Sequence, residues 1–277
     1  MILIADSGST KTSWYHSKGE NHSEIFTTQG INPFFRTTED IGNELQKELL
    51  PKTGTNIAEI HFYGAGIINK EKGTVVELAL KQLFPFATVE VQSDLVAAAR
   101  ATLGKESGIA CILGTGSNSC LFENDSVVGH VPPLGFILGD EGSGAVLGRK
   151  LVGDFLKGIM PKNLSEKFRS QFPVSYSGFL ENVYKKEKPN KFLAGFVPFL
   201  KENIDEEYCK KLVGESLDEF IERNIKQYAG YEKHRICFVG SVAFYFQDQL
   251  KSGLRKNGLK LDKIMKEPLQ GLIQYHL

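Results

Sequence analysis

Ile2-Leu3-Ile4-Ala5 leads directly into Asp6-Ser7-Gly8-Ser9-Thr10-Lys11-Thr12. This pattern occurs twice in the chain, and the repeat predicts the fold. The second copy is Ile109-Ala110-Cys111-Ile112-Leu113 followed by Gly114-Thr115-Gly116-Ser117-Asn118-Ser119. Each copy is a short apolar strand, a turn of glycine and hydroxyl residues, and a second strand. With Gly8 laid on Gly116, Ser9 falls on Ser117 and Trp14 on Phe122. Glycine lets the backbone approach oxygen atoms closely, and N–H groups and hydroxyls donate to them. The two turns are therefore interpreted as phosphate-binding turns around a single polyphosphate.

Length and composition describe an ordinary globular protein of one large or two ordinary domains. The chain has 277 residues, of which 41% are apolar and 24% charged. Lys plus Arg and Asp plus Glu both number 33, so no net field favours nucleic acid or an anionic membrane. No uncharged apolar run approaches the roughly 18 residues that a membrane helix needs. We expect neither nucleic acid nor a membrane as partner.

The N-terminus and the cysteines favour a cytoplasmic location. The chain enters a strand without a basic leader, which argues against a secretory signal. Its four cysteines show no C-x-x-C spacing, and buried reduced thiols are the simplest interpretation. The six histidines show no metal-ligand spacing, so we expect no zinc or iron–sulfur site.

Both halves place three strands before alternating helices and strands, which predicts a duplicated α/β domain with mixed sheets. In the first half, Thr38 is expected to cap a helix over about 41–49, a second helix covers 75–83, and a third starts at Leu95. In the second half, a mainly helical stretch covers about 145–231, and a last helix occupies the region of Pro268. The boundary is placed near Leu103-Gly104, which gives domains 1–103 and 104–261.

Three familiar phosphate signatures are missing from the chain. It contains no G-x-x-x-x-G-K-S/T segment. Asp6 and Gly8 lack the second acid of a D-x-D phosphotransferase, and Gly114 and Gly116 lack the third glycine of a dinucleotide fingerprint. Either hairpin alone could be a plain tight turn, but two copies in equivalent places favour a functional role.

Four motifs give the chain a resemblance to the N-acetylglucosamine kinases. They are the Asp6 to Thr12 turn, the Gly114 to Asn118 turn, Gly139-Asp140-Glu141-Gly142-Ser143, and Val239-Gly240-Ser241-Val242. That group is placed among the BadF/BadG/BcrA/BcrD-type ATPases of the sugar kinase–Hsp70–actin superfamily, and the resemblance covers nearly the whole chain. It implies two ribonuclease-H-like (actin-like ATPase) domains with mixed sheets around an inter-domain cleft for ATP and sugar. It also implies a C-terminal helix, about 262–277, that packs back onto the first domain.

The resemblance also implies roles for the two acids that end strands. Asp6 would hold Mg²⁺ through water, although an Asx-turn role is also open. Asp94 would be the catalytic base that takes a proton from the sugar hydroxyl, although its place at a helix start also fits an N-cap.

The remaining expected contacts divide between nucleotide and sugar, and several have plain structural alternatives. Asn32 also fits an ordinary turn, Lys11 a solvated face, Asp140 a helix N-terminus, and Gly195 helix packing. Leu134 stands where relatives often carry a tryptophan, so an aromatic sugar platform is missing and Phe136 is a possible substitute. The residues expected to bind the nucleotide are Gly8, Ser9, Thr10, Lys11, Gly114, Thr115, Gly116, Asn118, Gly195, Gly240 and Ser241. The residues expected to bind the sugar are Asn32, Asp94, Thr115, Leu134, Gly135 and Asp140.

These features together predict an ATP-dependent, Mg²⁺-assisted kinase that phosphorylates an amino sugar, N-acetylglucosamine first, at its 6-hydroxyl. Glucosamine, N-acetylmuramic acid or another hexose is an alternative substrate. A non-kinase ATPase activator or a sensor of sugar or ATP is an alternative function. A homodimer is a possible assembly.

Overall fold

The computed structural model describes residues 1–8, 10–19 and 22–277, and these form two compact units. Unit 1 contains residues 1–104 together with 268–277. Unit 2 contains residues 105–267. Unit 1 is therefore made of two separate stretches of chain, and each unit is described by itself below.

Unit 1 is built on a five-stranded mixed sheet in the order β3-β2-β1-β4-β5. β1 runs antiparallel to β2 and parallel to β4, so the sheet joins a hairpin meander to parallel crossover strands. The strands are β1 (Ile2–Ser7), β2 (Lys11–Ser17), β3 (Ser23–Gln29), β4 (Glu59–Gly64) and β5 (Thr88–Ser93).

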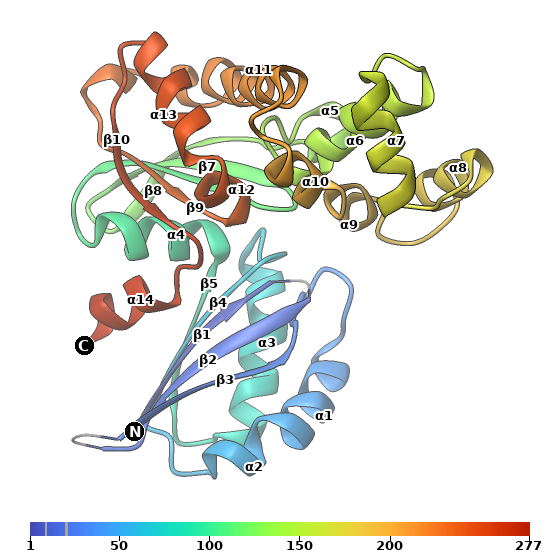
Figure 1. Ribbon diagram of the computed structural model, residues 1–277. Helices are drawn as coiled ribbons and strands as arrows, with labels where there is room; N and C mark the ends of the chain where they lie inside the picture. Colours follow the sequence, from blue (N-terminus) through green and yellow to red (C-terminus); the bar gives the residue numbers. More distant parts are fainter. Residues whose placement is uncertain (9, 20–21) are drawn as a thin grey trace. The chain divides into compact units, whose positions relative to one another are not determined.

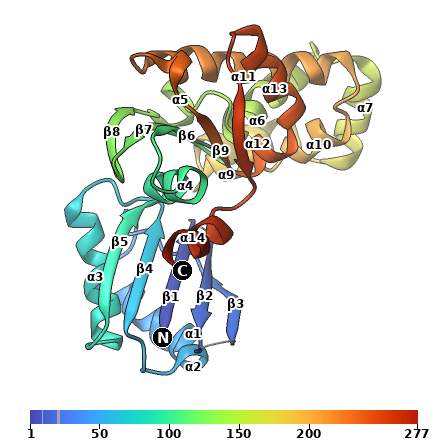
Figure 2. The same cartoon turned by 90° about the vertical axis from the view of Figure 1, so that its left-hand side faces the viewer.

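The helices of unit 1 cover the two faces of this sheet unequally (Figures 1 and 2). Trp14 and Phe62 point toward α1 and α3 and are fully buried with them in one apolar core. Because side chains alternate along a strand, His61 and Tyr63 point to the other face, where α14 lies. The helices are α1 (Thr38–Glu48), α2 (Leu50–Thr53), α3 (Lys70–Leu83), α4 (Asp94–Leu103) and α14 (Leu269–His276).

Three expected helix boundaries are wrong. Thr37, not Thr38, caps α1, because its side chain accepts from the Asp40 N–H while Asp40 accepts from the Thr37 N–H. α3 begins at Lys70, after the cap residue Asn69 and five residues before the expected start at Val75. The prediction missed this start because the first turn of the helix is polar and shows no apolar spacing. Residues expected to begin the C-terminal helix at about 262 instead form β10 (Leu261–Met265), and α14 starts only at Leu269.

Unit 2 repeats the sheet of unit 1 in the order β10-β9-β6-β7-β8. β6 pairs antiparallel with β7 and parallel with β9, as β1 does with β2 and β4. The duplicated α/β fold with mixed sheets is thus confirmed. The other strands are β6 (Gly108–Leu113), β7 (Ser117–Glu123), β8 (Ser126–Val131) and β9 (Ile236–Val239).

The helices of unit 2 fill most of the chain between β8 and β9, and they enclose a core rich in phenylalanine. Phe168, for example, packs against Phe179, Phe196 and Phe199 with ring centroids 5.1 to 6.4 Å away. The helices are α5 (Gly135–Leu138), α6 (Gly144–Leu156), α7 (Lys162–Gln171), α8 (Tyr176–Tyr184), α9 (Pro189–Ala194), α10 (Val197–Glu202), α11 (Glu207–Arg223), α12 (Ser241–Tyr245) and α13 (Gln247–Lys256), with 3-10 turns at Ile225–Gln227 and Tyr231–Lys233.

The strand pairing corrects the register in which the two hairpins correspond. Gly8 and Gly114 are each the first residue after their strand, so Gly8 matches Gly114 rather than Gly116. Ser7 pairs with Thr12, whereas Leu113 pairs with Ser117, so the two turns differ by one residue in length. Sequence spacing alone cannot fix a register across turns of unequal length. Among the described residues, no helix is both long and apolar enough to cross a membrane.

Candidate functional site

In unit 1, the turn between β1 and β2 is closed by backbone hydrogen bonds. The Gly8 N–H donates to the Lys11 carbonyl at 3.0 Å, and the Gly30 N–H donates to the Thr10 carbonyl at 3.1 Å. Asp6 lies near the end of β1, paired with Tyr63 of β4. Ser9, expected to bind phosphate, lies outside the described residues. The turn thus presents Asp6 beside a Gly-containing backbone loop.

Two buried hydroxyls connect this turn to the segment that carries Asn32, and sequence reasoning missed both. The Ser7 and Thr12 hydroxyl oxygens are 2.7 Å apart. The Ser7 hydroxyl also accepts from the Ile31 N–H at 3.0 Å and donates to the Ile31 carbonyl at 3.0 Å. A buried hydroxyl needs such partners. The inward position of Ser7 and Thr12 in their strands was the available signal.

Asn32 stabilises a turn, as the alternative interpretation of this residue predicted, and it also contacts the loop after β4. Its side-chain oxygen accepts from the Phe34 N–H at 3.0 Å. A Cβ placed on Gly66 would lie 2.0 Å from that oxygen, and Gly66 has φ of +81°. Only glycine fits at position 66, so Gly66 belongs to the candidate site. The sequence predicted only a Gly-rich turn at this position.

Asp94 is the first residue of α4 but does not cap it. The cap is Ser93, whose hydroxyl accepts from the Val96 N–H at 3.3 Å. Burial raises the pKa of the Asp94 carboxyl to about 6, and hydrogen bonds from the N–H groups of Leu95 and of Asp94 itself pull it downward. The N-cap explanation is therefore wrong, because capping α4 does not require the Asp94 carboxylate.

In unit 2, the turn between β6 and β7 is held from behind by the start of α6. The Gly114 N–H donates to the Gly116 carbonyl at 2.9 Å. The Gly144 N–H donates to the Gly114 carbonyl at 2.8 Å, and the Ala145 N–H donates to the Thr115 carbonyl at 3.0 Å. These bonds fix the turn and use two N–H groups at the start of α6.

The Asp140 carboxylate lies beneath the same turn. It accepts from the Ser117 N–H at 3.2 Å, and a Cβ on Gly116 would lie 3.3 Å from its nearer oxygen. Burial raises the pKa of the Asp140 carboxyl, which the Ser117 N–H opposes and the neighbouring Glu141 charge reinforces. The Glu141 carboxylate forms an ion pair with Arg223, whose Nε lies 2.9 Å from Glu141 Oε1. Asp140 is thus the carboxylate of this pair that supports the turn.

A cavity of about 380 Å³ opens beside this turn within unit 2. Its lining is mainly apolar with a few polar side chains, the usual character of a small-molecule site. The lining residues are Gly114, Thr115, Gly144, Ala194, Val197, Pro198, Lys201, Glu202, Ser241, Val242 and Tyr245.

Two glycines next to residues that line the cavity allow close backbone packing, one before α12 and one inside α6. Gly240, with φ of +122°, precedes Ser241, and a Cβ on it would lie 2.2 Å from the Leu113 carbonyl oxygen. Gly148 lets α6 approach α9, since its Cβ would lie 1.9 Å from the Leu193 carbonyl oxygen. Gly195 ends α9 and is not among the lining residues, whereas its neighbour Ala194 is. Sequence reasoning named the segment of Gly195 but missed Ala194 and Gly148.

The other expected contacts of unit 2 lie outside this cavity. Asn118, on β7, accepts from the Ser119 N–H at 3.0 Å and lies 2.9 Å from His130 Nε2. Leu134 has φ of +61° and is 60% exposed, and Gly135 has φ of +73°. Their loop is closed by the Asp140 N–H, which donates to the Pro133 carbonyl at 2.8 Å. Roles for Asn118, Leu134 and Gly135 stay predictions.

Comparisons with known proteins agree with this arrangement. No protein-family model matches the chain. A crystal structure of a candidate N-acetylglucosamine kinase from Porphyromonas gingivalis is 45% identical, covers 100% of this chain and 98% of that chain, and superposes with a TM-score of 0.95. A second candidate N-acetylglucosamine kinase, from Chromobacterium violaceum, shares the fold at 17% identity with a TM-score of 0.76, covering 100% of this chain and 98% of that chain. The N-acetyl-D-glucosamine kinase of Dictyostelium discoideum is 30% identical over 146 residues, which are 52% of this chain and 44% of that protein.

Two matching sheets with equivalent turns define the actin-like sugar-kinase fold, as expected. The chain belongs to the N-acetylglucosamine kinase family, because its likeness to the Porphyromonas gingivalis protein extends over essentially the full length of both chains. Its match to the curated relative spans less than half of that relative. Membership of the BadF/BadG-type group stays a prediction.

Proposed function

We propose that this protein is an ATP-dependent kinase of an amino sugar, N-acetylglucosamine first among them. The observation that carries the proposal is the cavity of unit 2, which adjoins the Gly114-Thr115-Gly116 turn. Its apolar wall at Ala194 and Val197 suits an adenosine, and the turn suits the phosphates that follow it. The family to which the chain belongs supports the same assignment.

The sugar would be held in unit 1 and deprotonated by Asp94. A general base works best with a pKa near the operating pH, and the pKa of about 6 for Asp94 meets that need while leaving most of the carboxylate ionised at neutrality. Asp94 would take the proton of the 6-hydroxyl as the hydroxyl oxygen bonds to the γ-phosphorus of ATP, while the bond from that phosphorus to the bridging oxygen breaks and ADP leaves. Asn32, held over Gly66, would supply an amide to the sugar ring.

The Asp6 carboxylate would supply an oxygen ligand for the Mg²⁺ ion that accompanies ATP. Asp6 stands at the end of β1 beside the Gly8 turn, and a single carboxylate suits Mg²⁺, which keeps several waters and binds phosphate oxygens. Mg²⁺ would neutralise charge on the transferring phosphoryl group. The N–H groups and hydroxyls around Gly8, Thr10 and Lys11 would orient the phosphates.

A cytoplasmic location is part of the proposal. The four cysteines, Cys111, Cys120, Cys209 and Cys237, are all free and buried. Free thiols persist in reducing compartments.

The decisive experiment measures ADP release by the purified chain with Mg²⁺-ATP and a panel of hexoses and N-acylated hexosamines. The expected result is turnover with N-acetylglucosamine and formation of its 6-phosphate, identified by NMR of the product. Best turnover with glucosamine or N-acetylmuramic acid would reassign the substrate. Tight ATP binding without turnover on any sugar would contradict the kinase and favour a sensor or an activating ATPase.

A further inference from the structure

A hydrogen-bonded network on the α14 face of the unit 1 sheet joins four elements. The Arg100 guanidinium of α4 donates through Nη1 to the Tyr63 hydroxyl of β4 and to Glu90 Oε1 of β5, each at 2.8 Å. The Tyr63 hydroxyl lies 2.8 Å from His276 Nε2 of α14. Burial lowers the pKa of His276 to about 4, so its ring is neutral at pH 7 and Nε2 can accept from the Tyr63 O–H.

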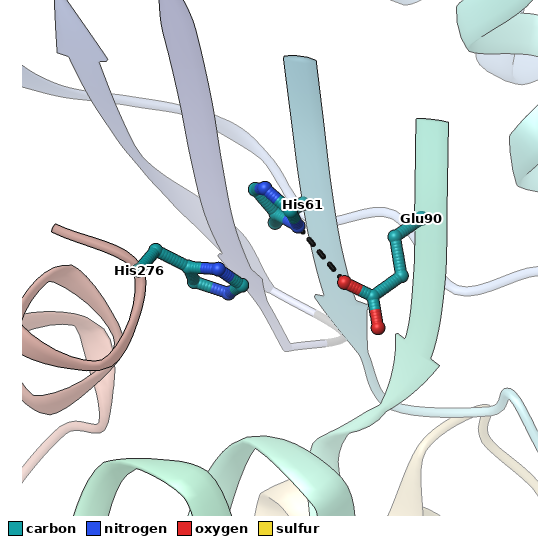
Figure 3. A group of neighbouring side chains, drawn as sticks. All are labelled: His61, Glu90 and His276. Carbon is teal, nitrogen blue, oxygen red and sulfur yellow. Dashed lines mark hydrogen bonds and ion pairs between the residues drawn. The ribbon is translucent and has the colours of Figure 1, made fainter. Parts of the chain in front are cut away.

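His61 completes the cluster, as Figure 3 shows with Glu90 and His276. His61 Nδ1 lies 2.8 Å from Glu90 Oε2. The His61 and His276 rings stack with centroids 3.7 Å apart and an angle of 25° between their planes. The two helices and two strands are thereby tied together by side chains that come from distant parts of the sequence.

Donor atoms of His61, Glu90 and His276 lie within 4.8 Å of one another, a spacing that a metal ion could use. Two observations favour a network without metal. The Arg100 guanidinium already supplies a positive charge against Glu90. The two imidazoles stack with centroids 3.7 Å apart, and the in-plane lone pairs of stacked rings do not point into the space between the rings.

Backbone packing extends the same connection. A Cβ on Gly271 of α14 would lie 2.4 Å from the Ala101 carbonyl oxygen of α4, so the two helices touch through their backbones. Arg100 and Ala101 lie less than two turns from Asp94, the first residue of the same helix. A helix of this length moves as one body, so whatever holds its middle also places its first residue.

We propose that Arg100 is a positioning residue, which, through Tyr63, Glu90 and His276, fixes α4 and thereby the direction of the Asp94 carboxylate. This inference rests on the proposed kinase function for its catalytic meaning. The Arg100 side chain is only 9% exposed, so loss of its fork leaves Glu90 without its cation in a partly buried place. Displacement of a catalytic group by about 1 Å can lower turnover about 100-fold.

The test compares Arg100→Lys and Tyr63→Phe with the native chain. Lysine keeps the charge but lacks the flat guanidinium, which in Arg100 lies 4.9 Å from the centre of the Tyr275 ring. Phenylalanine keeps the ring of Tyr63 but breaks the bridge from Arg100 to His276. Arg235→Lys is the matched control, because Arg235 makes an Arg–carboxylate pair with Asp262 in unit 2 and shares no partner with this network.

The expected result is a fall in kcat of about tenfold or more in both variants with the KM for ATP unchanged, since the cavity of unit 2 is untouched. Amide hydrogen exchange over 94–103 should quicken in both variants and stay native in the control. Native kcat and native exchange in both variants would overturn the inference. Stabilisation of the native chain by Zn²⁺, lost in a His61→Gln variant, would also overturn it by revealing a metal site. Absence of turnover in the native chain would contradict only the kinase function, since the exchange measurement still decides whether Arg100 holds α4.

Discussion

The carboxylate of Asp140 accepts a hydrogen bond from the backbone N–H of Ser117 at 3.2 Å and so supports the glycine turn of unit 2 from below. This contact gives Asp140 a structural task in addition to the sugar contact expected of it. Both residues are buried, at 9% and 6% exposure, so the N–H has no ready replacement partner. Substitution of Asp140 should therefore destabilise the glycine turn that contains Gly116.

Asp140→Ala is expected to lower the free energy of unfolding by about 1 to 3 kcal/mol, because it strands the Ser117 N–H. Asp140→Asn is the matched control, since its side-chain oxygen can still accept and asparagine tolerates the φ of +54° at this position. Urea unfolding of both variants measures the difference. Equal loss in the two would mean that the charge, and not the hydrogen bond, holds the turn.

Ala194→Leu is expected to raise the KM for ATP about tenfold or more while the KM for sugar stays native, because the larger side chain fills the cavity beside Val197. Ala58→Leu, at an exposed position in unit 1, controls for the added bulk. Initial rates with each substrate varied in turn separate the two constants. A native KM for ATP in the leucine variant would place the nucleotide elsewhere.

The activity should fall on acidification through about pH 6, because Asp94 accepts a proton only when ionised and its pKa is about 6. Below that pH, kcat/KM is expected to fall about tenfold per unit. Asp94→Asn should lower kcat by a factor of at least 100 with ATP binding retained, and its residual rate should lack this acidic limb. An unchanged limb in the Asn variant would assign the ionisation to another group.

The stability of the chain should fall between about pH 6.5 and pH 4, because burial and the neighbouring His61 lower the pKa of His276 to about 4 in the folded state from its ordinary 6.5. In this window the unfolded chain binds more protons than the folded one, so acid favours unfolding. The titratable and charged groups that face the ring are His61, Glu59, Tyr63, Glu90, Arg100 and Tyr275.

His276→Phe keeps a ring for stacking and removes this titration, so its free energy of unfolding should vary less over the window. Urea unfolding at several pH values compares the slopes. A second loss, below about pH 4.5, should remain in the variant, because hydrogen bonding to His61, and then Arg100, holds the pKa of Glu90 at about 2. Identical slopes in the native chain and the variant would show that His276 titrates as if exposed.

Gly66→Ala is expected to raise the KM for sugar, because a Cβ there would displace the Asn32 amide. Gly54→Ala is the matched control, with a similar positive φ of +64° and no neighbour within 4 Å. The left-handed backbone should lower the stability of each variant by about 1 to 2 kcal/mol, and the clash with Asn32 adds a further loss in Gly66→Ala alone. Only the first should alter the sugar constant, and a matching change in the control would refute a role for Asn32.

The repeated hairpin made the duplicated sheets predictable, because two similar strand–turn–strand patterns in equivalent places leave little choice of topology. Helix starts were less predictable. Asn69 and Thr37 act as caps before polar first turns, and a search for apolar spacing passes over such turns. β10 was missed because an edge strand with Lys263 at its middle alternates weakly.

Site residues could be predicted where the residue type and its position suggest few roles. They could not be predicted where their role comes from contacts between elements distant in sequence. Asp94 at a strand end suggested chemistry, but only the structure shows that Ser93 supplies the cap. Gly148 and Ala194 looked like ordinary helix residues, since their importance comes from the approach of α6 to α9. The Arg100 network joins residues up to 215 positions apart, His61 and His276, which no local pattern reports.

The assignment of residues 268–277 to unit 1 has a consequence for biosynthesis. The five strands of that unit lie within residues 2–93, yet α14, which covers His61 and Tyr63, is translated only after the whole of unit 2. Until then the part of the nascent sheet that α14 covers stays open to water and to chaperones. Completion of unit 1 therefore waits for the synthesis of unit 2.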